Sequence, residues 1–209
     1  MTAREEILAA IRARQVRDAE RPPQLRIAPP AEDLAAHFVQ RARAAAAQVH
    51  VLASAERIPG AIADILRSRN LPAIVHLPPD PLLEQIPWNE VRGLSIRTDL
   101  PGPDDVAISF VPLAIAETGT LVYLASPARP PSWHFRPGVE IALLGADNIH
   151  SRFEDICTRL AERGALPSTV NLVTGPSRTG DIEQTLELGA HGPKELVILI
   201  VPSFGSGDV

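Results

Sequence analysis

The segment 170–201, VNLVTGPSRTGDIEQTLELGAHGPKELVILIV, predicts a strand, a loop, a helix and a second strand in that order. Val170–Val173 is a short apolar run, and Gly175 interrupts it because glycine is a strong breaker of regular structure. A helix is expected next, with acids in its first turns where the helix N-terminus carries partial positive charge, and with Gly189 as its stop. Leu196–Val201 is apolar without alternation, which is typical of a strand covered on both faces.

Apolar runs and helical patterns alternate along much of the chain, and this alternation indicates an α/β fold with a mostly parallel sheet. Strands are predicted at 49–52, 73–77, 94–98, 106–110, 120–124 and 139–144, and helices at 58–66 and 153–160. The region 106–144 holds several strands without a helix between them. It is therefore expected to contain a local antiparallel excursion or a small hairpin.

Residues 1–48 are predicted to form an N-terminal helical arm with a proline-rich linker, and residues 49–209 an α/β domain. Helical patterns cover 2–19, where Ile7, Leu8 and Ile11 share one face, and 32–48. Four prolines within 21–30 indicate an extended linker. Three arrangements of the two helices stay open: a mobile arm, packing on the domain, or contact with another subunit.

The composition excludes some classes of protein. The net charge of −5 lacks the basic footprint of a nucleic-acid-binding protein. No apolar run approaches the roughly 20 residues of a membrane span. The N-terminus has acids and no apolar core of a signal peptide, so a cytoplasmic location is expected.

The chain has one cysteine, Cys157, which limits its redox chemistry. One cysteine forms no internal disulfide, and an iron–sulfur cluster usually takes four ligands. No cofactor is therefore expected on this chain, and any such cluster would belong to a partner. Cys157 falls on the apolar face of the predicted 153–160 helix, which predicts a buried small hydrophobe. The glycine-rich nucleotide motifs are absent, and the six histidines show no metal-ligand spacing.

The loop after Val170–Val173 is a candidate anion site, because ligands of open α/β sheets bind beyond the carboxyl ends of strands and anions bind at helix N-termini. Its residues are Gly175, Pro176, Ser177, Arg178 and Thr179. Arg178 adds a fork-shaped donor suited to carboxylate or phosphate. His191, between the expected helix and the last strand, is a further ligand candidate. The alternatives are an ordinary strand–helix turn with a solvent-facing arginine and a histidine that bonds the backbone.

A second stretch, Ala114–Leu124 (AIAETGTLVYL), places Glu117 between apolar runs. A carboxylate in such surroundings is costly unless it is paired, hydrogen-bonded or used in chemistry. Gly119 allows close backbone approach or a positive φ. Glu117 is therefore a candidate catalytic residue, with Thr118, Gly119 and Thr120 as ligand-binding neighbours. The alternative is a turn between two strands with Glu117 pointing outward.

Together, Ala114–Ser126 and Val173–Val201 resemble the lactate-utilization protein C family, also known as the LUD-domain family. The resemblance covers about half of the chain, from roughly Val106 onward. It implies a Rossmann-like layered sheet resembling the sugar-phosphate isomerase and CoA-transferase (NagB/RpiA/CoA-transferase-like) superfamily. The chain departs from the family pattern at 132–137, which predicts a reshaped wall of the expected cleft.

The resemblance also implies a function. Members belong to a three-protein bacterial system that oxidises L-lactate to pyruvate, in which the other two proteins carry the iron–sulfur clusters. This chain is then expected to be a non-redox component that binds a small carboxylate or phosphate, such as lactate or pyruvate, or that helps to assemble its partners. Two alternatives stay open. One is a stand-alone CoA-transferase-like or isomerase-like enzyme with Glu117 as nucleophile. The other is a metabolite-sensing module that reports through residues 1–48.

Overall fold

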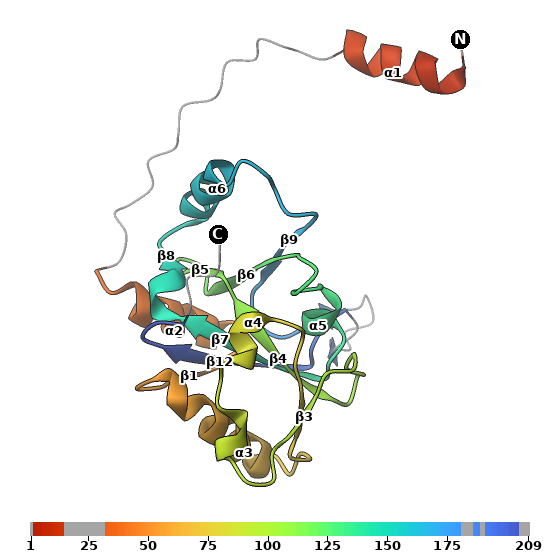
Figure 1. The fold of residues 1–209 in the computed structure, drawn as a ribbon. Helices are drawn as coiled ribbons and strands as arrows, with labels where there is room; N and C mark the ends of the chain where they lie inside the picture. The colour runs from red at the N-terminus through yellow and green to blue at the C-terminus, as the bar shows by residue number, and fades with distance from the viewer. Residues whose placement is uncertain (1, 15–31, 181–185, 189–190, 205–209) are drawn as a thin grey trace.

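The computed structural model describes residues 2–14, 32–180, 186–188 and 191–204. Its centre is a six-stranded sheet in which all pairs are parallel (Figure 1). In spatial order the strands are β1 (Gln48–Val51), β12 (Glu195–Val201), β7 (Val139–Gly145), β4 (Val106–Val111), β2 (Ile74–His76) and β3 (Ser95–Arg97). The predicted α/β fold with a mostly parallel sheet is therefore confirmed.

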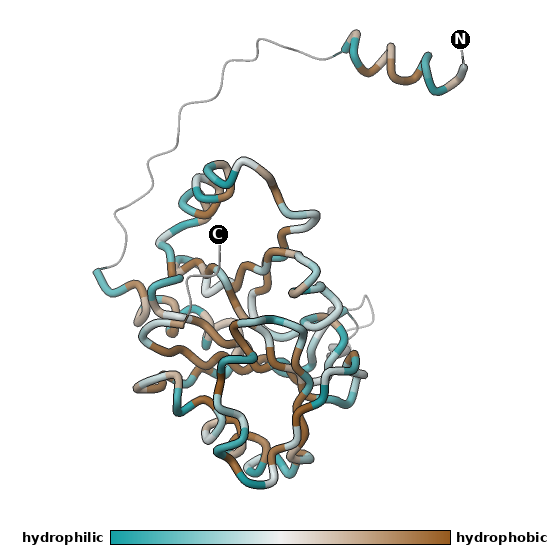
Figure 2. The backbone as a smooth tube through the Cα atoms, viewed as in Figure 1, coloured by the Kyte–Doolittle hydropathy of each residue, from teal (hydrophilic) through white to brown (hydrophobic). Residues whose placement is uncertain are grey.

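The central strands are apolar because both faces of the sheet are covered. Every residue of β7 is buried, and β12 is buried from Leu196 onward. Figure 2 shows the hydrophobic segments concentrated in these strands. One face packs against α3 (Ile58–Ser68) and the short α4 (Pro81–Glu84). Short 3-10 turns follow β1 and β7, at Ala55–Arg57 and Ala146–Asn148, and another follows α4, at Trp88–Glu90.

The other face carries a second sheet and a helix. The order of this second sheet is β8 (Ile149–His150), β5 (Leu113–Ile115), β6 (Thr120–Leu124) and β9 (Val170–Val173). Strands β5 and β6 form an antiparallel hairpin, which confirms the excursion predicted within 106–144. The short α5 (Ser132–Phe135) connects this sheet back to β7, and α6 (Phe153–Glu162) packs on its outer side.

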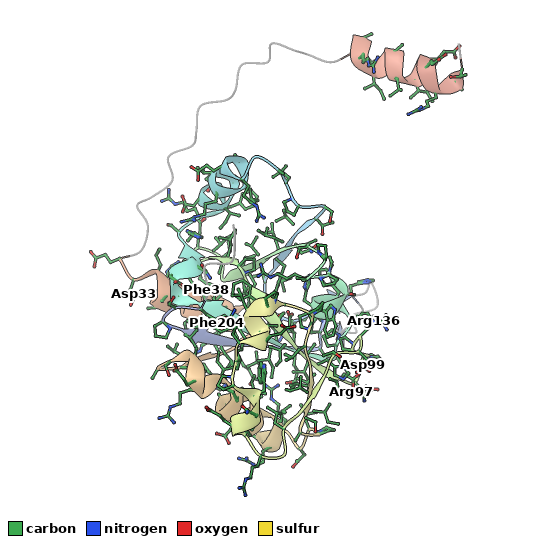
Figure 3. All side chains as sticks on the ribbon, viewed as in Figure 1. Asp33, Phe38, Arg97, Asp99, Arg136 and Phe204 are labelled. Atoms are coloured by element: carbon green, nitrogen blue, oxygen red, sulfur yellow. The ribbon has the colours of Figure 1, made fainter. Side chains whose placement is uncertain are left out.

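Helix α2 (Leu34–Ala44) packs against the central sheet, with Phe38 and Ala42 fully buried. Figure 3 shows Phe38 directed into the domain and Asp33 at the outer end of the helix. Three arrangements of the N-terminal helices were left open, and for α2 the structure shows packing on the domain. Helix α2 lies before residue 49, where the α/β domain was predicted to begin. Helix α1 (Ala3–Ala13) begins with a Thr2–Glu5 capping box and has no buried residue.

The helix predicted after Gly175 is wrong. Strands β10 (Arg178–Gly180) and β11 (Leu186–Leu188) pair antiparallel across that segment. Gly180 and the β-branched Thr179 have low helix propensity, so pairing of the backbone prevails over the weak helical pattern. The expected helix stop, Gly189, lies outside the described residues. Strand β9 also runs antiparallel to β6 in the second sheet, so the loop after it is not at a carboxyl edge of the parallel sheet.

The burial predicted for Cys157 is also wrong, because its side chain is exposed. Helix α6 itself is confirmed, but Ile156 is its one buried residue and Leu160 is partly buried. The helix lies on the outer side of the small second sheet, so only a narrow stripe is covered. Cys157 stands at the border of that stripe.

Candidate functional site

The connections of the central sheet change faces between β2 and β4. Helices α3 and α4, which follow β1 and β2, lie on one face, whereas β5 and β6, which follow β4, lie on the other. Such a change opens a crevice beyond the carboxyl ends of the two strands, which is where open α/β sheets bind ligands. The candidate site is therefore sought between the ends of β2 and β4.

A buried ion pair occupies this crevice. Asp80, in the loop after β2, is fully buried, and its carboxylate accepts from Arg129 Nε at 2.5 Å and from Nη2 at 3.4 Å. The Arg129 guanidinium lies over the Phe110 ring, 4.6 Å from its centroid. Asp80 also accepts from the backbone N–H of Leu82 and so caps α4. These contacts hold Arg129 in one orientation.

Below the ion pair lies a buried carboxyl group, that of Glu140 on β7. Its Oε1 accepts from Ser109 Oγ at 2.5 Å and from Tyr123 OH at 2.8 Å, whereas Oε2 is buried without a hydrogen-bond partner among the described residues. Burial raises the pKa of Glu140 to about 7, although both hydroxyl groups oppose that shift. Burial and the nearby Glu140 carboxylate raise the pKa of Tyr123 well above its usual value. A pKa of about 7 would suit Glu140 to proton transfer at neutral pH.

His134, on α5, covers Tyr123. The two rings stack at 4.2 Å between centroids with an angle of 16° between their planes. Burial lowers the pKa of His134 to about 4, so its imidazole is neutral at pH 7. Its Nε2 lies 3.5 Å from the side-chain nitrogen of Asn171 on β9. The ring therefore offers a hydrogen bond without a charge.

We call Asp80, Ser109, Tyr123, Arg129, His134 and Glu140 the crevice cluster. A cavity of about 10 Å³ lies among four of them and the apolar side chains of Phe110 and Trp133. That volume holds about one water molecule. The cluster combines a buried ion pair in which Arg129 is held by Asp80, a neutral imidazole, two hydroxyl groups and an acid with a pKa of about 7. This set is suited to binding a small polar anion and to transferring a proton.

A larger cavity of about 280 Å³ lies beyond the carboxyl ends of β1 and β12. Its polar lining comes from Glu56, Gln85 and Ser203. A hydrogen bond from Ser203 Oγ to Asp147 Oδ2, 2.8 Å long, adds a second carboxylate nearby. With one acid and no cation in its described lining, and a second carboxylate nearby, this cavity disfavours an anion.

The structure brings the two sequence blocks of the predicted site together. Strand β6 pairs with β9, so that Leu121 faces Val173. The hydroxyl groups of Thr118, Thr120 and Thr174 form a chain with oxygen–oxygen distances of 2.6 and 2.7 Å. The predicted neighbours Thr118 and Thr120 thus lie beside the start of the second block.

Both blocks use a glycine to contact α2, and we call Gly119, Thr120, Thr174 and Gly175 the α2 seat. Gly119 has φ +69°, and a Cβ there would lie 2.3 Å from the backbone nitrogen of Ala42. Gly175 has φ +76°, and a Cβ would lie 2.0 Å from the carbonyl oxygen of Ala45. The predicted close approach at Gly119 is therefore confirmed, and the neighbour is the C-terminal half of α2.

Glu117 lies in the turn between β5 and β6 and is partly exposed. Its backbone N–H donates to Ser151 O at 3.1 Å, and its carbonyl accepts from Arg41 Nε at 2.9 Å. No hydrogen bond or ion pair among the described residues joins the Glu117 side chain to Arg178, which is exposed on β10. Glu117 therefore lies in a turn between two strands, and its catalytic role stays a prediction.

The second block forms a local structure around Ser177. Its backbone N–H donates to Pro193 O at 2.8 Å, and its Oγ accepts from the backbone N–H of His191 at 3.4 Å. His191 is exposed, and Pro176 is partly buried. The structure therefore brings Ser177 and His191 together through the backbone. Thr179 lies in β10.

One residue of the crevice cluster, Glu140, was indicated by the same pattern that singled out Glu117, a carboxylate among apolar residues. Glu140 stands in an apolar strand, VEIALLG, so the cost of a lone carboxylate applies to it more strongly than to Glu117. The pairing of Asp80 with Arg129, 49 residues later, has no sequence signal. Among the described residues there is no group of three His, Cys, Asp or Glu side chains placed to hold a metal ion. None of the described helices is long and apolar enough to cross a membrane.

A known protein family matches the C-terminal half of the chain. Residues 104–201 match the family model of the LUD domain, which confirms the predicted resemblance and its extent. The chain is 38% identical over 99 residues to an uncharacterized protein of Neisseria meningitidis, covering 46% of this chain and 42% of that protein. It is 30% identical over 118 residues to lactate utilization protein C of Geobacillus kaustophilus, covering 54% of this chain and 49% of that protein.

A second lactate utilization protein C, that of Geobacillus thermodenitrificans, is 31% identical over 118 residues, with 54% of this chain and 49% of that protein covered. The chain thus spans about half the length of the curated relatives it matches. The crystal structure of a DUF162 family protein from Deinococcus radiodurans has a TM-score of 0.59 and 21% identity, covering 80% of this chain and 96% of that one. At this identity the likeness concerns the fold, and the predicted superfamily stays a prediction.

Proposed function

We propose, from the LUD-domain match of residues 104–201, that this chain is a non-redox component of a bacterial L-lactate utilization system and binds a small carboxylate such as lactate or pyruvate. Relatives named lactate utilization protein C support the system. The observation that supports the ligand is the position of Arg129. Its side chain is held by the buried Asp80 in the crevice between β2 and β4, where the connections of the sheet change faces.

Arg129 suits a carboxylate because its guanidinium has two edges that each present a pair of donors. Asp80 uses the Nε/Nη2 edge. No hydrogen bond of the described residues involves Nη1, and the side chain keeps 23% of its surface exposed. A ligand carboxylate meets that second edge without displacing Asp80.

The rest of the crevice cluster suits the other polar group of such a ligand. The Tyr123 and Ser109 hydroxyl groups line the cavity together with the neutral imidazole of His134. These groups both donate and accept hydrogen bonds, so they accommodate a 2-hydroxyl or a 2-keto oxygen. The cavity of about 10 Å³ is smaller than lactate, so binding requires movement of the loop 125–131 that carries Arg129.

The redox chemistry is assigned to partners in this proposal. Oxidation of lactate requires an electron acceptor, and iron–sulfur clusters are usually held by four ligands. The chain offers one thiol, that of Cys157, so its residues do not fit such a cluster. We therefore expect the clusters on partner proteins of the same system.

Growth of a deletion strain on L-lactate as sole carbon source tests the function. The strain is complemented with the wild type, Arg129→Lys or Arg97→Lys. Lysine at 129 keeps an ion pair with Asp80 but loses the fork. Arg97 forms a similar two-point pair with Asp99 on the surface, at 2.8 Å twice (Figure 3), and is the matched control. Wild type and Arg97→Lys are expected to restore growth, whereas Arg129→Lys is not.

Titration calorimetry of the purified proteins with lactate and pyruvate accompanies the growth assay. Arg129→Lys is expected to raise the dissociation constant about tenfold or more, since a hydrogen bond to a charged group contributes roughly 1.5–3 kcal/mol. Glu117→Gln and Arg178→Ala test the predicted site in the motif loops. If those two variants lose binding and growth while Arg129→Lys keeps both, the ligand site lies there instead. Growth of the uncomplemented deletion strain on lactate would overturn the proposed function.

A further inference from the structure

Helix α1 presents an apolar stripe that nothing in the described chain covers. Ile7, Leu8 and Ile11 keep 60%, 38% and 53% of their surface exposed. The Thr2–Glu5 capping box fixes the start of the helix, with Thr2 N donating to Glu5 Oε2 at 2.7 Å. An isolated helix of 11 residues is marginal in water, so its stability comes from packing its apolar face. The stripe therefore requires a partner surface.

An apolar groove of about 580 Å³ lies between α2 and the edge of the central sheet. Val39 of α2 forms one wall, and Val51 of the edge strand β1, with 67% of its surface exposed, forms the other. Charged residues stand at opposite ends of the α2 side, Asp33 before its first turn and Arg43 in its last turn. The groove is thus a helix-sized apolar surface with one charge at each end.

The charges of α1 match those of the groove in one orientation. Glu5 and Glu6 lie in the first turn of α1 and Arg12 in its last turn. Placed antiparallel to α2, the acids of α1 meet Arg43 and Arg12 meets Asp33. Antiparallel packing also sets the helix dipoles in the favourable sense.

We propose that α1 of a second copy of this chain fills the groove, so that two chains exchange their N-terminal helices. In the described chain α1 has no buried residue, and the groove beside its own α2 is empty. Reciprocal exchange covers both stripes and both grooves with one two-fold contact, which is a common route to dimers. This interface is independent of the crevice cluster.

Light scattering of the full-length protein tests the exchange. The wild type is expected to be a dimer. Ile11→Asp on the stripe and Val51→Asp in the groove are each expected to raise the dimer dissociation constant roughly tenfold to a hundredfold. Ala9→Asp, on the opposite face of α1, is the control and is expected to stay dimeric. Circular dichroism verifies that the variants fold, because all three positions are on the surface.

Disulfide formation then identifies the occupant. In a Cys157→Ser background, a chain with Ile11→Cys is mixed with a chain with Ala36→Cys, which lies in the groove. A disulfide-linked heterodimer is expected, and Ala9→Cys in place of Ile11→Cys is expected to give none. A monomeric wild type, a dimer that both aspartate variants leave intact, or an intramolecular disulfide in the doubly substituted chain would each overturn the proposal.

Discussion

The α2 seat and the crevice cluster are built in opposite ways. The α2 seat consists of two glycines and two threonines that follow each other closely in two sequence blocks. The glycines contact the backbone of α2 and its C-cap, and the threonines bond each other through their hydroxyl groups. The crevice cluster consists of charged and aromatic side chains from β4, β6, β7, α5 and two loops. The difference teaches that the glycines and threonines of the two recognisable sequence blocks serve packing, whereas the perturbed ionisable groups other than Tyr123 stand outside those blocks.

The glycines of the α2 seat give the largest expected effect. Gly119→Ala and Gly175→Ala combine a positive φ, which costs roughly 1–2 kcal/mol, with overpacking, which costs roughly 1–3 kcal/mol. We expect each to lower the free energy of unfolding by up to about 5 kcal/mol in urea titrations. Gly60→Ala in α3, where a Cβ meets nothing within 4 Å, is expected to stabilise by about 0.5–1 kcal/mol. Equal effects at the three positions would contradict the packing role.

Breaking the ion pair between Asp80 and Arg129 is expected to give the second-largest loss of stability. Arg129→Met leaves the fully buried Asp80 without its cation, so the free energy of unfolding is expected to fall by about 3 kcal/mol. Arg97→Met removes a pair in which both side chains are more than half exposed, and a change within about 1 kcal/mol is expected. Chemical denaturation at pH 7 measures both. A loss at Arg129 no larger than at Arg97 would mean that the crevice opens to water.

Glu140 gives a smaller effect that depends on pH. Its folded pKa of about 7 exceeds the ordinary 4.5, so unfolding releases a proton between these values. The stability contributed by Glu140 is therefore complete below pH 4.5 and is lost as the pH rises through 7, by at most about 3 kcal/mol. Because the contribution of His134 changes in the opposite direction over much of this range, the decline is measured as the difference in the free energy of unfolding between the wild type and Glu140→Gln, by denaturation between pH 5 and 8.5. The exposed Glu90→Gln is the control and should keep the pH profile of the wild type.

His134 also makes the free energy of unfolding depend on pH, in the opposite direction to Glu140. Its folded pKa of about 4 is below the ordinary 6.5, so the stability it contributes is present above pH 6.5 and lost as the pH falls through 4. Glu140→Gln is expected to keep the loss of stability at low pH that His134 causes. If Glu140→Gln had the same pH profile as the wild type, the titrating group would lie outside the crevice cluster.

Much of the fold followed from local patterns. The strands 139–144 and 196–201 were predicted almost to their ends, because an unbroken apolar run has a single stable place between two covered faces. The helix predicted after Gly175 failed because its pattern was weak and short, and strand pairing satisfied the backbone instead. The prediction that Cys157 is buried was wrong because helical spacing gives the direction of the apolar face of a helix but not how much of that face is covered.

The candidate site was less predictable. Gly119 was expected to allow a close approach, but the neighbour, α2, was not foreseeable from the sequence. Asp80 follows β2 of the central sheet and Arg129 follows β6 of the second sheet, so only the packing of the two sheets brings their loops together. Glu140 had a signal in its apolar strand, yet its partners Ser109 and Tyr123 come from other strands.

The sequence by itself determined the α/β class and most strands and helices, because these depend on interactions between near neighbours along the chain. The tertiary structure decided which ionisable groups are buried together. Burial and pairing in a medium of low dielectric set the pKa of Glu140 and hold Arg129 at the switch point. Those energies arise between residues tens of positions apart, so no local pattern records them.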